Sequence, residues 1–196
     1  MQWNQEAELF LDALSSDKPT PGGGAAAAMA GAMGCALLLM SIGTTLKRKN
    51  TPDAHKTSLK QWQEKITTRQ KELKHLMQQD AQAYTAYIAA YRLPSDNPSR
   101  EKELQQALLT ATTVPADIAS CCQSVLQEIN NLKPLIAPII LSDVYCARHL
   151  LKSGLACGIE NIRTNLKGIT DTNCIEKFKQ LLASFEREIK NESDPA

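Results

Sequence analysis

The residue in this sequence best suited to acid–base chemistry is Asp80, because a helical hydrophobic pattern points its carboxylate inward. Asp80 shares a stripe of three- and four-residue steps with Leu73, Leu76, Tyr84 and Tyr87. Burial disfavours the charged form of a carboxyl group and raises its pKa, which suits proton transfer near neutral pH. The alternative is a structural aspartate that pairs with a Lys, an Arg or a helix end.

A second candidate is the segment Pro21, Gly22, Gly23 and Gly24, which precedes a stretch rich in Gly and Ala. Free backbone N–H groups at a helix start can bind an anion, and glycine lets a ligand approach closely. No Gly-Lys-Ser/Thr follows, so nothing indicates a nucleotide-binding P-loop. Taken alone, such a motif is more often only a turn.

Polar residues after Pro138 form a third candidate group. Asn161 follows Asp143 by 18 residues, which is five full helical turns, and Asn165 lies within about 40° of the same face. A straight helix would separate Asp143 from Asn161 by about 27 Å. Either these residues serve different sites, or a second subunit completes each site. The alternative is that the asparagines only satisfy neighbouring backbone groups.

Metal and thiol chemistry have no support in the spacing of histidines and cysteines. The three histidines are far apart, and none of the six cysteines forms a C-x-x-C pair. We therefore expect no metal site. The chain starts without a basic and apolar leader, which predicts a cytoplasmic protein whose thiols are reduced and mostly buried.

The elements that must position these residues are helices. Aromatic residues make up only 5% of the chain, and no long strand-like alternation appears. Helices are predicted over 4–14, 25–46, 51–93, 139–168 and 172–190, with a further helix after Pro98 that Pro115 kinks or breaks before 116–132. The sequence thus predicts an all-α bundle of five or six helices, a single domain over 1–196 with frayed ends at 1–3 and 191–196.

The charge distribution limits the classes of partner. With 22 Lys+Arg against 21 Asp+Glu, the chain does not resemble a polybasic nucleic-acid binder. No charged residue lies between Lys18 and Lys47, so a membrane span must be considered. Gly and Ala dominate this stretch, however, and they favour close helix packing over lipid contact. A buried central helix without a membrane partner is therefore the better prediction.

The order of these motifs resembles the formiminotransferase-cyclodeaminase C-terminal domain family, which includes free-standing methenyltetrahydrofolate cyclohydrolases. The resemblance spans roughly residues 8–170. It is carried by Phe10 to Leu14, Pro19 to Gly34, Asp80 to Tyr84, Leu93-Pro94, Val114-Pro115, Ser142-Asp143 and Asn161 to Leu166.

This resemblance implies an all-helical homodimer that acts on tetrahydrofolate derivatives, without a metal or a cofactor beyond the folate. Members hydrolyse 5,10-methenyltetrahydrofolate to 10-formyltetrahydrofolate, or they cyclise 5-formiminotetrahydrofolate with release of ammonia. Carried onto this chain, it implies Asp80 as the general acid and base. It also implies Asp143 as a second carboxylate for water or the pterin amino edge, and Lys47 as a contact for the glutamate tail. The remaining implied substrate contacts are Pro21, Gly22, Gly23, Gly24, Asn161 and Asn165.

Two departures from the family pattern leave an alternative open. Members carry a Gly-Asn run before Ser-Asp, whereas residues 135–141 of this chain are mainly aliphatic, and Ala25 replaces a small polar residue after the glycines. If the missing asparagines contact substrate, the protein is a catalytically silent helical dimer that binds or scaffolds. The lack of an attached formiminotransferase domain in the sequence favours cyclohydrolase over cyclodeaminase.

Overall fold

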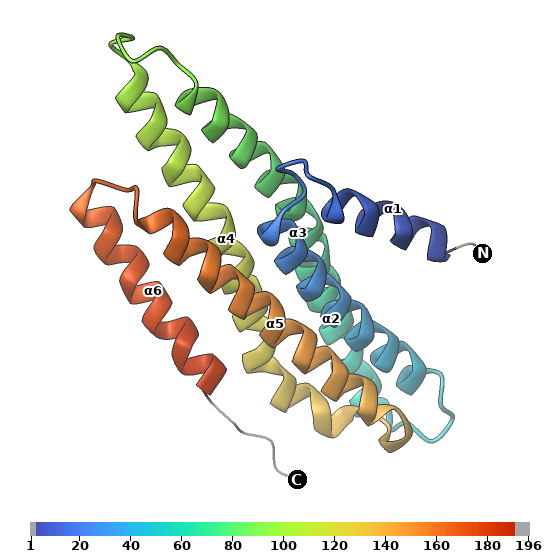
Figure 1. The fold of residues 1–196 in the computed structure, drawn as a ribbon. Helices are drawn as coiled ribbons and strands as arrows, with labels where there is room; N and C mark the ends of the chain where they lie inside the picture. Colours follow the sequence, from blue (N-terminus) through green and yellow to red (C-terminus); the bar gives the residue numbers. More distant parts are fainter. Residues whose placement is uncertain (1–2, 191–196) are drawn as a thin grey trace.

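Helices account for most of residues 3–190, the part of the chain that the computed structural model describes (Figure 1). No strand occurs in this range, so the predicted all-α class and helix number are confirmed. The predicted frayed ends lie outside the described residues, except for Trp3, where the first helix begins. In chain order the elements are α1 (Trp3–Ser15), α2 (Gly23–Leu46), α3 (Asp53–Tyr91), α4 (Arg100–Leu132), the short 3-10 turns η1 (Lys133–Leu135) and η2 (Pro138–Ile140), α5 (Leu141–Leu166) and α6 (Thr172–Lys190).

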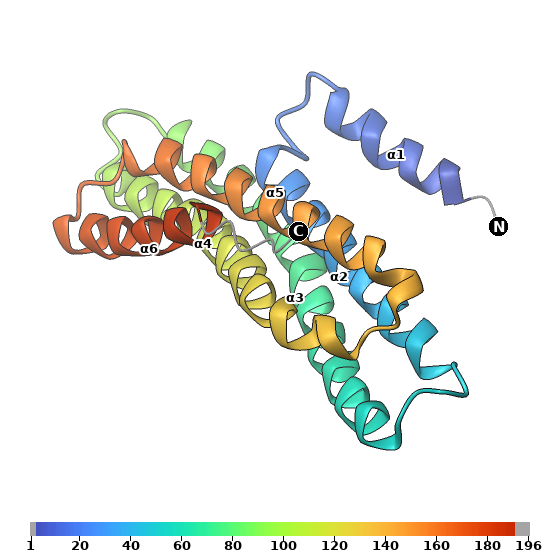
Figure 2. The same ribbon diagram turned by 90° about the horizontal axis from the view of Figure 1, so that it is seen from below.

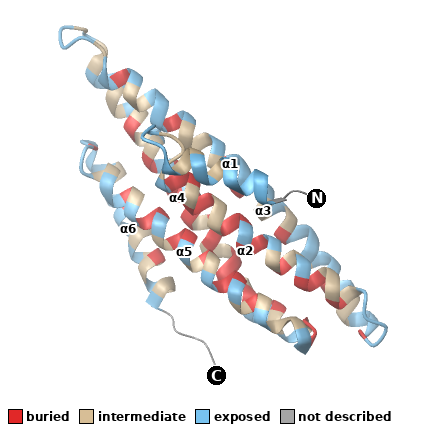
Figure 3. Cartoon of the chain, turned by 45° about the vertical axis from the view of Figure 1, so that its right-hand side comes forward, coloured by how far each residue is buried: buried red, intermediate tan, exposed pale blue. Residues whose placement is uncertain are grey.

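Four of these helices form the body of the molecule. Helix α2 packs against α3 and α5, and α4 packs against the same two helices. Helix α6 covers the outside of α4 and α5, whereas α1 stands away from the bundle (Figure 2). Buried residues follow the inward faces of the helices (Figure 3), and they form one connected hydrophobic core.

Helix α2 is the central helix because its small residues let its neighbours approach. A Cβ atom on Gly34 would lie 2.9 Å from the carbonyl oxygen of Ala147, and one on Gly154 would lie 2.9 Å from that of Ala27. Larger side chains at these positions would force α2 and α5 apart. By length and composition α2 is also a helix that could cross a membrane, but 56% of its apolar stretch is buried inside the protein.

Helix α4 continues through Pro115, so the break that the sequence suggested there is wrong. Proline has no N–H, and it therefore leaves the carbonyl oxygen four residues earlier without its helical donor. That oxygen belongs to Ala111, and the Nδ2 of Asn165 on α5 donates a hydrogen bond to it at 2.7 Å. The neighbouring helix thus replaces the hydrogen bond that Pro115 removes.

The thiols are less uniformly buried than predicted. Cys35, Cys121 and Cys122 lie in the core, whereas Cys146 and Cys157 on α5 are exposed. Burial raises the pKa of Cys35 to about 12 and that of Cys121 to about 12. These two side chains therefore pack as small neutral groups and are poor nucleophiles.

Candidate active site

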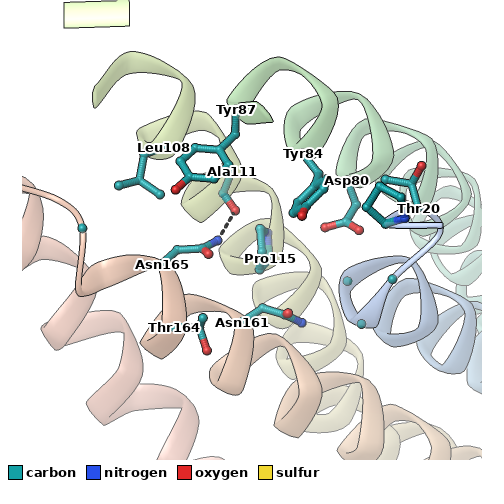
Figure 4. Close-up of a pocket in the computed structure, with 15 residues that line it drawn as sticks. Thr20, Asp80, Tyr84, Tyr87, Leu108, Ala111, Pro115, Asn161, Thr164 and Asn165 are labelled. Carbon is teal, nitrogen blue, oxygen red and sulfur yellow. Dashed lines mark hydrogen bonds between the residues drawn. The ribbon is translucent and has the colours of Figure 1, made fainter. Parts of the chain in front are cut away.

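A cavity of about 400 Å³ opens where the N-terminus of α2 meets α3, α4 and α5 (Figure 4). Four predicted groups that are distant in the sequence meet here: the glycine segment, Asp80, Asn161 and Asn165. Side chains of all three neighbouring helices line the cavity, as do residues of the loop that leads into α2. The lining includes Pro19, Thr20, Gly22, Gly23, Gly24, Asp80, Tyr84, Tyr87, Leu108, Ala111, Pro115, Asn161, Thr164 and Asn165.

Asp80 belongs to α3, and its half-buried carboxylate packs against the first turn of α2. Burial raises the pKa of Asp80, and a hydrogen bond from the backbone N–H of Ala25 opposes part of that rise. Hydrogen bonding within α2 starts with the N–H of Ala26, which donates to the carbonyl oxygen of Gly22 at 3.0 Å. The carboxylate therefore caps a helix end and also faces a cavity, so the structural and catalytic interpretations of Asp80 are compatible.

Gly24 is required for this contact between α2 and α3. A Cβ atom on Gly24 would lie 2.0 Å from Oδ1 of Asp80 and 2.4 Å from its Cγ. No side chain fits at this position while the carboxylate stays in place. Gly23 is less crowded, since its Cβ would lie 3.3 Å from Oδ1 of Asn161, and the first contact at Gly22 is an ordinary 3.5 Å. Pro21 is not among the lining residues.

The two asparagines reach the cavity from successive turns of α5. The Nδ2 of Asn161 donates to the carbonyl oxygen of Cys157 at 2.9 Å, and the Nδ2 of Asn165 donates to that of Ala111 at 2.7 Å. Both asparagines therefore donate to backbone carbonyl groups, which is the structural alternative that the sequence left open. It occupies only the amide nitrogens, however, and both side chains still line the cavity.

Two tyrosines line the cavity without having been selected as site residues from the sequence. Tyr84 and Tyr87 follow Asp80 on α3, and their ring centroids are 6.4 Å apart. They offer an aromatic wall for a planar ligand. The signal was present, because both share the helical stripe of Asp80, but aromatic residues at this spacing are equally typical of a helix core.

Lys47 and Asp143 lie at the opposite end of the bundle. Lys47 follows the last residue of α2, and 24 helical residues place it about 36 Å from the glycine segment. Asp143 lies in the first turn of α5, which runs antiparallel to α2. Neither residue lines the Asp80 cavity of the same chain, and neither do residues 135–141, which depart from the family pattern. The site roles of Lys47 and Asp143 remain predictions.

Within residues 3–190 no group of three or more His, Cys, Asp or Glu side chains is arranged to hold a metal ion. The chemistry that the described groups themselves offer is proton transfer by Asp80 and hydrogen bonding by amides and backbone N–H groups.

Comparison with known proteins gives similar sequences and a similar structure. Residues 6–184 match the sequence profile of the formiminotransferase-cyclodeaminase family. The chain is 36% identical over 190 residues to methenyltetrahydrofolate cyclohydrolase of Methylorubrum extorquens, covering 92% of this chain and 89% of that protein. It is 29% identical over 199 residues to formimidoyltransferase-cyclodeaminase of Sus scrofa, covering 94% of this chain but only 35% of that longer protein. The crystal structure of formiminotetrahydrofolate cyclodeaminase from Thermotoga maritima matches with a TM-score of 0.84 and 28% identity, covering 93% of this chain and 89% of that chain.

Proposed function

The chain belongs to the formiminotransferase-cyclodeaminase family, and from this premise we propose that it is a folate one-carbon enzyme that hydrolyses 5,10-methenyltetrahydrofolate to 10-formyltetrahydrofolate. The observation that carries the proposal is Asp80, a half-buried carboxyl group with a raised pKa in a cavity. The similarity to the Methylorubrum cyclohydrolase, which extends over most of both chains, supports hydrolysis as the reaction.

The reaction needs one group that moves a proton twice. Water adds to the carbon that bridges N5 and N10, and the Asp80 carboxylate takes a proton from that water as the C–O bond forms. The resulting carboxyl group then gives its proton to N5, and the C–N5 bond breaks. The hydroxyl on the same carbon loses its proton to solvent and becomes the carbonyl oxygen of the N10-formyl group. The methenyl cation and water thus give 10-formyltetrahydrofolate and one proton, and a carboxyl pKa above its ordinary value serves both transfers.

The surroundings of Asp80 suit this sequence of steps. The N–H groups of Gly23 and Gly24 have no partner within α2, because its helical bonding begins with Ala26. They can donate to the oxygen that is added to the bridging carbon. Tyr84 and Tyr87 form a wall for the planar part of the substrate. No metal, and no cofactor beyond the folate substrate, is part of this proposal.

A homodimer in the cytoplasm is a further part of the proposal, and the exposed face of α2 supports pairing with a second copy. Met33 and Met40 on this helix are 45% and 44% exposed, and α2 carries no charge that such a contact would bury. Two-fold symmetry permits the α2 helices of two copies to pack antiparallel. The glycine end of one α2 would then lie beside Lys47 and Asp143 of the second copy.

The near-ultraviolet absorbance of 5,10-methenyltetrahydrofolate tests the function. We expect the protein to accelerate the decay of this band, and we expect Asp80→Asn to slow turnover by about 10²-fold or more. Asp117→Asn on α4 is the matched control, because the pKa of Asp117 is also raised but the residue lies outside the cavity.

The same assay separates the other functions. Growth of the band from 5-formiminotetrahydrofolate, with release of ammonia, would identify a cyclodeaminase, the second candidate that the similarity to the Thermotoga enzyme supports. No change with either compound, together with no folate binding, would leave a protein that only binds or scaffolds.

A further inference from the structure

The amide of Asn165 is held in one orientation by a defect in the neighbouring helix. Pro115 cannot donate to the carbonyl oxygen of Ala111, because it has no N–H. The Nδ2 of Asn165 donates to that oxygen at 2.7 Å (Figure 4). A backbone carbonyl can only accept a hydrogen bond, so the atom that faces it is the amide nitrogen. Oδ1 of Asn165 is thereby left as the free end of the amide.

Asn161 is oriented in the same sense, one turn earlier on α5. Its Nδ2 donates to the carbonyl oxygen of Cys157 at 2.9 Å. Its Oδ1 faces the start of α2, 3.3 Å from the place that a Cβ on Gly23 would occupy. Among residues 3–190, no side-chain or backbone donor bonds to Oδ1 of either asparagine. Both amides therefore offer the cavity an acceptor and keep their donors for the protein backbone.

This arrangement makes one wall of the cavity rich in acceptors. Residues four apart on a helix have Cβ atoms about 5–6 Å apart, so Asn161 and Asn165 suit two donors on one edge of a flat ring. Asp80 adds a carboxylate on the facing helix. A ligand edge that carried acceptors would meet like groups here and lose its hydrogen bonds to water.

We propose that Asn161 and Asn165 are specificity-determining residues: Oδ1 of Asn165 accepts a hydrogen bond from the amino group of the pterin, and Oδ1 of Asn161, which lies nearer to Gly23, accepts one from the adjacent ring N–H. This inference rests on the proposed function and deepens it. It places the amino edge of the pterin against Asn161 and Asn165 on α5. The family resemblance instead implied Asp143 as the contact for that edge. Asn165 gains this role because Pro115 fixes its amide.

Binding of 5-formyltetrahydrofolate and of its 2-desamino-2-methyl analogue, measured by calorimetry, tests the inference. We expect the wild-type protein to prefer the 2-amino compound by about tenfold, the usual scale for one hydrogen bond whose loss leaves an acceptor unpaired. Asn165→Leu keeps the approximate side-chain size and removes the acceptor, so we expect this preference to disappear. It also removes the donor to Ala111, and the variant should therefore be less stable.

The double variant Pro115→Ala with Asn165→Leu separates recognition from stability. The backbone N–H that Pro115→Ala creates can bond to the carbonyl oxygen of Ala111, so we expect thermal stability to recover while the preference stays lost. If the double variant, with its stability recovered, still prefers the 2-amino compound, the inference is overturned and the proposed function is left intact. Failure of the wild-type protein to bind either folate would instead overturn the proposed function, and the inference with it.

Discussion

Replacing Gly24 by alanine tests the contact on which the candidate active site depends. The three atoms nearest to the new Cβ, at 2.0, 2.4 and 2.7 Å, all belong to the carboxylate of Asp80. Overpacking of this kind lowers the free energy of unfolding by about 1–3 kcal/mol. Alanine also reduces the conformational entropy of the unfolded chain, which offsets about 0.4–1 kcal/mol of this loss. If the carboxylate moves aside instead, it leaves the N–H of Ala25, and a displacement of about 1 Å can slow turnover by about 10²-fold.

A double-mutant cycle with Asp80→Ala isolates this contact. The second substitution removes all three clashing atoms, so in its presence Gly24→Ala should stabilise the protein by about 0.4–1 kcal/mol. We therefore expect a coupling energy of about 1–3 kcal/mol between the two positions. Urea unfolding followed by circular dichroism gives the four free energies of unfolding, and decay of the methenyl band gives the activity of the two variants that keep Asp80. A coupling energy below about 0.5 kcal/mol would mean that the effects of the two substitutions are additive, and the carboxylate would not lie against Gly24.

Two further predictions concern pH and assembly. Because the folded pKa of Asp80 lies above its unfolded value of about 3.9, the native state binds the extra proton between the two values. Asp80 therefore makes the free energy of unfolding fall with rising pH in that window. Asp80→Asn should remove this contribution and make the wild-type slope less steep, leaving that of Asp117, whose pKa is also raised. Equal slopes in both proteins, from urea titrations at each pH, would contradict it. If Asp143 completes the site of a second copy, inactive Asp80→Asn and Asp143→Asn chains that are unfolded together and refolded should regain about one quarter of wild-type activity, because half of the dimers then contain one intact site. Refolding without any recovery would mean that Asp143 does not complete the site of a second copy.

The sequence was sufficient for most of the fold because the helices carry strong local signals. The stripe that contains Leu73 and Leu76 predicted both the length of α3 and the inward direction of Asp80. The uncharged stretch before Lys47 predicted a buried central helix, and the packing of α2 confirmed it. Such signals depend only on composition and on the spacing of hydrophobic residues, so they can be recognised without knowledge of the tertiary structure.

The composition of the site was harder to predict, because it depends on which helix ends meet. Periodicity placed Asp143 and Asn161 on one face of a helix, and it also required them to be far apart. It could not tell which end of that helix faces the glycine segment. The antiparallel packing of α2 and α5 decides this: Asn161 lies beside Gly23, and Lys47 lies at the far end of the bundle.

Three residues that break the rules of their own helices meet in one cavity. Asp80 is a carboxylate in an apolar stripe, Gly24 is a poor helix former in the first turn of α2, and Pro115 is a proline inside α4. Each is tolerated because another element compensates: the N–H of Ala25 bonds to the carboxylate, Gly24 leaves room for it, and Asn165 supplies the donor that Pro115 lacks. The sequence shows each exception but not its compensation, since the compensating group comes from a different helix. Exceptions that serve packing alone would be scattered through the core, whereas these converge on the groups that can move a proton and bind a ring edge.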